Sequence, residues 1–186
     1  MGVLRIFRAL LVTGMIFLVA GAGVCAPVGA TEPANEQDVK AVFLLNFVRF
    51  VEWPDSSDPN VPFVIGLIGD DAFRVTLQDL TAHERVHGRA IVVRHLDSPD
   101  GLGLCQMVFV SGSDAKRLAR AFEALRDRPI LTVGESDDFL QLGGIINLAK
   151  HNHRVGIEVN RLAAERARLQ ISSKLLALAH IVDVTP

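Results

Sequence analysis

The chain of 186 residues has little cysteine and no concentration of positive charge. It contains two cysteines, and its 19 Lys or Arg residues face 21 Asp or Glu residues, for a formal net charge of −2. Nucleic acid is therefore not expected as a partner, because phosphate binding needs a concentrated basic surface. A polytopic membrane protein is excluded, since only one stretch of the sequence is apolar over enough residues to be considered as a membrane span. With 49% apolar and 22% charged residues, the composition is that of a globular protein.

The one long apolar stretch lies at the start of the chain. Two arginines precede an uncharged apolar run over residues 9–22, and residues 28–30 (Val-Gly-Ala) are small, as signal peptidase prefers. This order is typical of a secretory signal peptide over residues 1–30, which leaves residues 31–186 as the folded domain. The alternative is an uncleaved anchor helix, although a span normally takes about 20 apolar residues. We expect export with cleavage.

Cleavage would leave a single thiol. Without residues 1–30 the chain keeps only Cys105, and its formal net charge becomes −4. An exported protein with one cysteine has no internal disulfide, so its core must hold it together unaided. Cys105 stands at the edge of an apolar run, where a free cysteine usually behaves as a small core residue.

Apolar periodicity predicts helices that alternate with short strands. The expected elements are helices over 38–52, from 71 through Leu80, around 118–125, and from Ser136 through Leu140; strands over 63–68, 90–96, 106–110 and 130–133; and a hairpin of strands 145–149 and 155–159. Asn160 is expected to cap a helix over residues 161–168, and Ser172 or Ser173 a last helix that reaches Ile181. This order predicts an α/β fold: a single three-layer domain with a mixed, partly parallel sheet and a C-terminal antiparallel hairpin.

Two turns follow strands and precede helices, at residues 69–71 and 111–114. Such turns line the crevice where open α/β sheets bind ligands, and helix N–H groups there can hold an anion. The candidate ligand-binding residues are Asp70, Asp71, Ser111 and Ser113. In the alternative interpretation these side chains only cap helices. Neither turn has the glycine spacing of a nucleotide-binding loop.

The sequence predicts no metal site, cofactor or catalytic set. His151 and His153 alternate in the expected hairpin loop, but a tight metal site needs three or four ligands. Residues 172–174 (Ser-Ser-Lys) lack the Ser-x-x-Lys spacing of penicillin-recognising enzymes. No Ser-His-Asp or Cys-His arrangement can be assembled. We therefore expect a protein that is not an enzyme.

The first and last expected helices carry more apolar residues than one small sheet requires. Exposed apolar patches bounded by polar residues mark interaction sites. Both helices could equally complete the core.

Several runs of residues, in order along the chain, make it resemble a known family, the YfiR family of periplasmic regulators. These runs are DVKAVFLLNFVRFVEWP (38–54), IGLIGDD (65–71), HGR (87–89), CQMVFVS (105–111), GGIIN (143–147), EVN (158–160) and ISSKLL (171–176).

The resemblance implies a periplasmic α/β protein, often dimeric, that is not an enzyme and represses an inner-membrane diguanylate cyclase by binding its periplasmic sensor domain. Release of that repression raises cyclic di-GMP and favours biofilm formation. The expected partner-binding residues are Phe47 and Leu175 on the terminal helices, with Glu158, Asn160 and Arg161 as polar anchors. The alternative is a periplasmic small-ligand sensor that acts on another membrane signalling protein, such as a histidine kinase.

Overall fold

The computed structural model describes residues 35–54, 58–69, 71–97, 99–112, 119, 122, 125, 127–151 and 154–184. The chain divides into two compact units, Met1–Glu32 and Pro33–Pro186, and the fold described here is that of the second. The predicted signal peptide lies outside the described residues.

The first helix, α1, spans Glu36–Phe50, and Asn35 caps it by accepting a hydrogen bond from the Gln37 N–H at 3.4 Å. The prediction of a helix through residue 52 was wrong at its end. The chain becomes extended at β1 (Val51–Glu52), which pairs antiparallel with β9 (Gln170–Ile171) in a separate two-stranded sheet. The following Trp53-Pro54 fits this extended exit, because proline disfavours the α region in the residue before it.

The main sheet has eight strands in the order β10-β8-β7-β6-β5-β2-β4-β3. Their bounds are β2 Phe63–Ile68, β3 Arg85–Val86, β4 Arg89–His95, β5 Met107–Val110, β6 Leu131–Gly134, β7 Ile146–His151, β8 Arg154–Val159 and β10 His180–Ile181. The β7–β8 and β3–β4 pairs are antiparallel, and the other pairs are parallel. The predicted mixed sheet and C-terminal hairpin are therefore confirmed.

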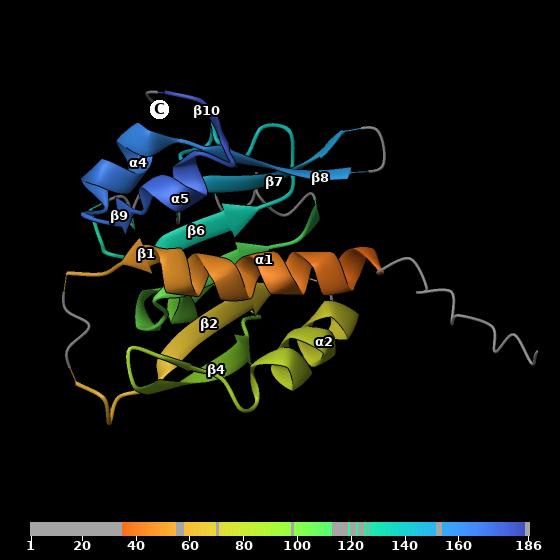
Figure 1. Ribbon diagram of the computed structural model, residues 1–186, viewed down its shortest axis with the longest axis vertical. Helices are drawn as coiled ribbons and strands as arrows, with labels where there is room; N and C mark the ends of the chain where they lie inside the picture. Colours follow the sequence, from red (N-terminus) through yellow and green to blue (C-terminus); the bar gives the residue numbers. More distant parts are fainter. Residues whose placement is uncertain are drawn as a thin grey trace, which may run out of the picture. The chain divides into compact units, whose positions relative to one another are not determined.

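Apolar residues cover both faces of this sheet, as the three-layer prediction requires. In β2, Phe63, Ile65 and Leu67 face a core shared with α1, α2 (Asp71–Thr81), α4 (Arg161–Arg166) and α5 (Ser173–Leu176). Val64 and Ile68 face a second core on the other side, shared with the 3-10 helix η1 (Pro99–Leu104), Phe122, Leu125 and Phe139. Figure 1 shows α1 and α2 lying over one face of the strands.

Two predicted helices differ from the structure. Residues 136–143 form hydrogen-bonded turns in which the Phe139 N–H bonds to the Ser136 carbonyl at 3.0 Å, and the Ser136 hydroxyl has no partner among the described residues. The last helix ends at Leu176, and His180–Ile181 instead extends the sheet as β10. Of the helix expected around residues 118–125, positions 118 and 121 lie outside the described residues.

Candidate functional site

Asn160 occupies the junction between β8 and α4. Its side-chain oxygen accepts a hydrogen bond from the Ala163 N–H at 3.1 Å, which confirms the predicted cap of α4. Its amide nitrogen donates to the Val184 carbonyl at 2.9 Å, and the residue has no exposed surface. Asn160 therefore positions the C-terminal segment and presents no side chain to a partner.

Glu158 and Arg161, the other expected polar anchors, are at least partly accessible. A Glu158 carboxylate oxygen accepts a hydrogen bond from the buried Asn147 amide at 3.0 Å. The Arg161 guanidinium is exposed and lies 3.4 Å from Asp183 and 3.8 Å from Glu165. Both expected anchors thus sit where β8 meets α4, beside the last residues of the chain.

Phe47 and Leu175 are not on the surface, which corrects their expected place in a partner contact. Phe47 is fully buried and Leu175 is 3% exposed, both in the core beneath α1. Most apolar residues of α1 are therefore buried in the core. The sequence had left open whether this helix completes the core or contacts a partner. Apolar surface near the C-terminus comes instead from Leu178, 76% exposed, and Ile181, 38% exposed.

We call Arg161, Leu178, Ile181 and Asp183 the C-terminal face. Leu178 follows α5, and Ile181 lies in β10, the edge strand of the main sheet. Figure 1 shows α4, α5 and β10 gathered at the same end of the sheet. The face combines accessible aliphatic side chains with an arginine–aspartate pair.

The two turns expected to bind a ligand do come together. Gly69 follows β2 with a positive φ of 106°, and a Cβ placed on it would lie 2.1 Å from the Ser111 hydroxyl oxygen. The Ser111 N–H donates to the Ile68 carbonyl at 3.0 Å. Asp71 begins α2, while Asp70 and Ser113 lie outside the described residues.

A cavity of about 310 Å³ lies beside Ser111, at the carboxyl ends of β5 and β6; we call it the carboxyl-edge cavity. Glu36, Lys40 and Glu135 also line it. Lys40 Nζ lies 2.7 Å from Glu36 and 2.5 Å from Glu135, and Lys150 also contacts Glu36, at 2.6 Å. The Gly112 N–H donates to the second Glu135 oxygen at 3.0 Å.

These charges shift one another's titration. Hydrogen bonds from Lys150 and Lys40 hold the pKa of Glu36 below its ordinary value of 4.5. Burial alone lowers the pKa of Lys40, but the carboxylates of Glu135 and Glu36 outweigh it and raise that pKa above 10.5. The cluster could not be predicted from the sequence, because Glu36 and Lys40 are far from Glu135 along the chain and share no motif with it.

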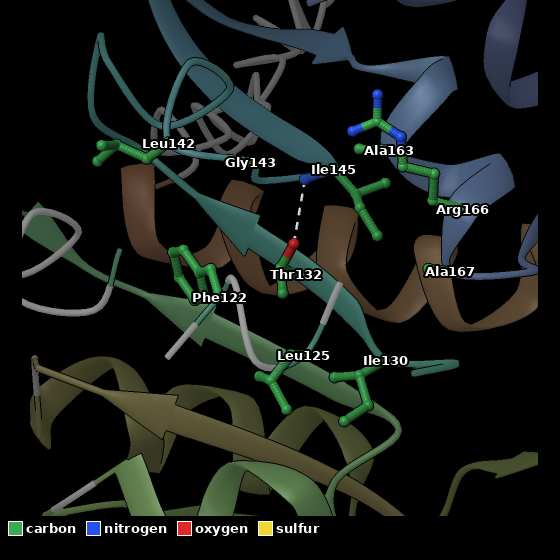
Figure 2. A pocket seen from close by; sticks show the side chains of 10 residues that line it. All are labelled: Phe122, Leu125, Ile130, Thr132, Leu142, Gly143, Ile145, Ala163, Arg166 and Ala167. Atoms are coloured by element: carbon green, nitrogen blue, oxygen red, sulfur yellow. Dashed lines mark hydrogen bonds between the residues drawn. The ribbon is translucent and has the colours of Figure 1, made fainter. Parts of the chain in front are cut away.

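A smaller cavity of about 20 Å³ lies between β6 and α4 (Figure 2). Figure 2 shows the Thr132 hydroxyl directed at the Ile145 N–H, which donates to it at 3.0 Å. Phe122, Leu125 and Ile130 supply much of the remaining wall. A space of this size holds about one water molecule, so it is a packing gap rather than a ligand site.

Within the described part of the chain, no group of three or more His, Cys, Asp or Glu side chains could hold a metal ion. His153 lies outside the described residues. Among the described helices, none is both long and apolar enough to cross a membrane.

The structure is an α/β domain with a mixed sheet. It exposes Leu178 and Ile181 near the C-terminus and has a cavity lined by charged residues at the carboxyl ends of β5 and β6. The chain belongs to the YfiR/HmsC-like family, whose model matches residues 37–180. The predicted resemblance to the YfiR family is thereby confirmed.

Two solved structures are similar to parts of this chain. One is the ABC domain in complex with L-Trp from Streptococcus pneumonia, with 9% identity, a TM-score of 0.47, and coverage of 64% of this chain and 55% of that one. The other is a conserved domain protein from Vibrio cholerae O1 biovar El Tor, with 16% identity, a TM-score of 0.46, and coverage of 78% of this chain and 60% of that one. The chain thus spans just over half the length of each.

Proposed function

We propose that this protein is an exported, non-enzymatic regulator that binds the periplasmic sensor domain of an inner-membrane diguanylate cyclase and represses it. The observation that carries the proposal is the family match over residues 37–180. The signal-peptide pattern of residues 1–30 supports export, since a basic start, a short apolar run and small residues follow in order.

The C-terminal face is the surface best suited to that contact. Leu178 and Ile181 offer accessible aliphatic area, and the Arg161–Asp183 pair joins α4 to the same C-terminal segment. Apolar area bounded by charge is the usual anatomy of a protein interface, in which burial supplies affinity and the charges set register. The Leu178 N–H donates to the Leu175 carbonyl at 3.1 Å, a backbone bond that does not involve the Leu178 side chain.

The test is co-purification of the tagged protein with detergent-solubilised membranes, followed by mass spectrometry. We expect a membrane protein with a cyclic di-GMP-synthesising domain to accompany the wild type and to be lost with Leu178→Asp. Val42→Asp is the matched control, because Val42 is an aliphatic residue of α1 that is 47% exposed and lies beside Thr76 and Leu80 of α2. Equal recovery of the cyclase with both variants would contradict binding through this face, and its absence from the wild type would contradict the repressor function.

A small-ligand sensor is the second candidate function, and the carboxyl-edge cavity favours it. The space lies beside Ser111, where the sequence predicted a ligand, and it is lined by both charged signs. A ligand that binds the native state raises the melting temperature, so a thermal-shift panel of anions, nucleotides and amino acids tests this function. A shift that Glu135→Gln abolishes would support it, whereas no shift across the panel would count against it.

A further inference from the structure

A second cavity of about 310 Å³ opens at the opposite end of the parallel strands. Its lining comes from residues that precede or begin β2, β4, β5 and β6, so we call it the amino-edge cavity. Arg89, Arg128 and Trp53 contribute the most distinctive side chains. Trp53, Arg89 and Gln106 fall within the runs that carry the family resemblance, but the proposed function does not use this space.

Arg89, the first residue of β4, is 5% exposed. Its Nε and one terminal nitrogen donate to the Val61 and Pro62 carbonyls at 2.7 and 2.9 Å, and its guanidinium carbon lies 5.6 Å from the Phe63 ring centre. Within the described residues, no carboxylate pairs with it. A buried charge lowers stability unless an opposite charge pairs with it, and arginine stays protonated in proteins. A bound anion would therefore be stabilised beside the Arg89 guanidinium.

Arg128 brings a second positive charge to the cavity. One of its terminal nitrogens donates to the Gly103 carbonyl at 2.9 Å. A Cβ on Gly103 would lie 2.3 Å from the other terminal nitrogen, so the glycine leaves the room that this guanidinium occupies. No carboxylate among the described residues pairs with Arg128 either. The lining also includes one carboxylate, Asp58, which is exposed and accepts a hydrogen bond from the Asn60 N–H at 2.9 Å.

Most of the remaining lining is apolar, and Trp53 is its most firmly held member. Trp53 is 7% exposed, and its indole N–H already donates to the Gln106 carbonyl at 3.1 Å. Its ring meets Phe63 edge-on, with ring centres 4.9 Å apart. Val61 and Ile130 add aliphatic surface. The cavity therefore places apolar side chains beside two guanidinium groups, which is the mixture typical of small-ligand sites. The volumes of such sites start at about 300 Å³.

We propose that the amino-edge cavity binds a small organic carboxylate, with its anionic group between Arg89 and Arg128 and its apolar body against Trp53 and Val61. Two arginines and one aspartate give the lining a single net positive charge, which matches a monoanion better than a phosphate dianion. Arginine forks suit carboxylates geometrically, and hydrogen bonds to charged groups are the strong ones. This inference does not rest on the proposed regulatory function.

Trp53 provides the readout, because it is the only tryptophan in the chain. The purified protein is titrated with benzoate and with phenylacetate while its intrinsic fluorescence is followed. We expect a saturable change with at least one of these carboxylates, and much weaker binding of benzamide and benzylamine, which have similar shape but no negative charge. Arg128→Met should weaken carboxylate binding by about tenfold, the equivalent of one charged hydrogen bond.

Arg85→Met is the matched control. Arg85 is also exposed and also donates to a backbone carbonyl, that of Gly88 at 2.9 Å, but it does not line the cavity. Circular dichroism checks that both variants remain folded. If Arg128→Met unfolds, Arg128→Lys replaces it, because lysine keeps the positive charge. Arg128→Lys should still bind the carboxylate more weakly than the wild type, because lysine lacks the two-pronged guanidinium. The proposal is overturned if neither carboxylate gives a saturable change, if benzamide binds as tightly, or if the Arg85 and Arg128 variants bind alike.

Discussion

Lys40 of α1 and Glu135 after β6 form an ion pair across the carboxyl edge of the sheet, with Nζ and Oε2 2.5 Å apart. Their side chains are only 12% and 16% exposed, and Lys40 also reaches Glu36. Because Glu135 binds the Gly112 N–H as well, this pair joins the first helix to the turns after β5 and β6. Both residues line the carboxyl-edge cavity together with Ser111, one of the predicted ligand-binding residues.

Removal of one partner should leave an uncompensated, largely buried charge. We expect Lys40→Met to lower the free energy of unfolding by about 1–3 kcal/mol, between the values typical of exposed and of buried pairs. Lys150→Met is the control: its side chain is 60% exposed, and it should cost under about 1 kcal/mol. Urea denaturation measures both. Equal losses for the two variants would show that burial of the Lys40–Glu135 pair has no energetic weight.

Stability should also fall in acid through Glu36. Its pKa is depressed in the folded state by Lys150 and Lys40, so its contribution is present above its ordinary value of 4.5 and is lost as pH falls through the folded-state pKa. Glu36 is partly exposed, so the contribution is small. We expect Glu36→Gln to lose less unfolding free energy than the wild type between about pH 5 and about pH 3. Parallel acid profiles for the two proteins would contradict this assignment.

Cys105 should be unreactive in the native protein. It is 3% exposed, and burial raises the pKa of its thiol above 9.0, with Arg94 opposing the shift. Because the thiolate is the reactive form, iodoacetamide at about pH 8 should alkylate the native chain far more slowly than the chain in urea. Similar rates in the two conditions would mean that the thiol is accessible.

The Phe139 ring lies between two glycines, Gly134 of β6 and Gly144. A Cβ at either position would come within 2.2 Å of the ring. Since Phe139 is fully buried, Gly134→Ala should lower the free energy of unfolding by about 1–3 kcal/mol through overpacking. Combining it with Phe139→Leu should cost less than the sum of the two single changes. Strict additivity in thermal denaturation would argue that the ring moves away freely.

Much of the sheet could be predicted because its strands are buried on both faces. Residues 63–68 form an almost unbroken apolar run, and they became β2 with the predicted bounds. The two-residue strands β1 and β9 could not be predicted, since pairs so short carry no periodicity and depend on tertiary contact. The last helix was extended too far because Leu178 and Ile181 continue a helical spacing, although the chain turns after Leu176 to reach β8.

The site was less predictable than the fold. Asn160 was assigned both a cap and a partner contact, and its burial leaves only the cap. Apolar spacing could not distinguish Phe47, which faces the core, from a surface contact, because most sides of α1 are apolar and buried. The amino-edge cavity depends on Arg89 and Arg128, which are far apart in sequence and line one cavity only because of the strand order.

We propose that the protein represses cyclic di-GMP synthesis through its C-terminal face. The most direct measurement is the cellular cyclic di-GMP level after deletion of the gene and complementation with wild type, Leu178→Asp or Val42→Asp. We predict that deletion raises the level, that wild type and Val42→Asp restore it, and that Leu178→Asp, expressed at equal abundance, does not. An unchanged level after deletion would contradict the repressor function, and full restoration by Leu178→Asp would contradict the assigned face.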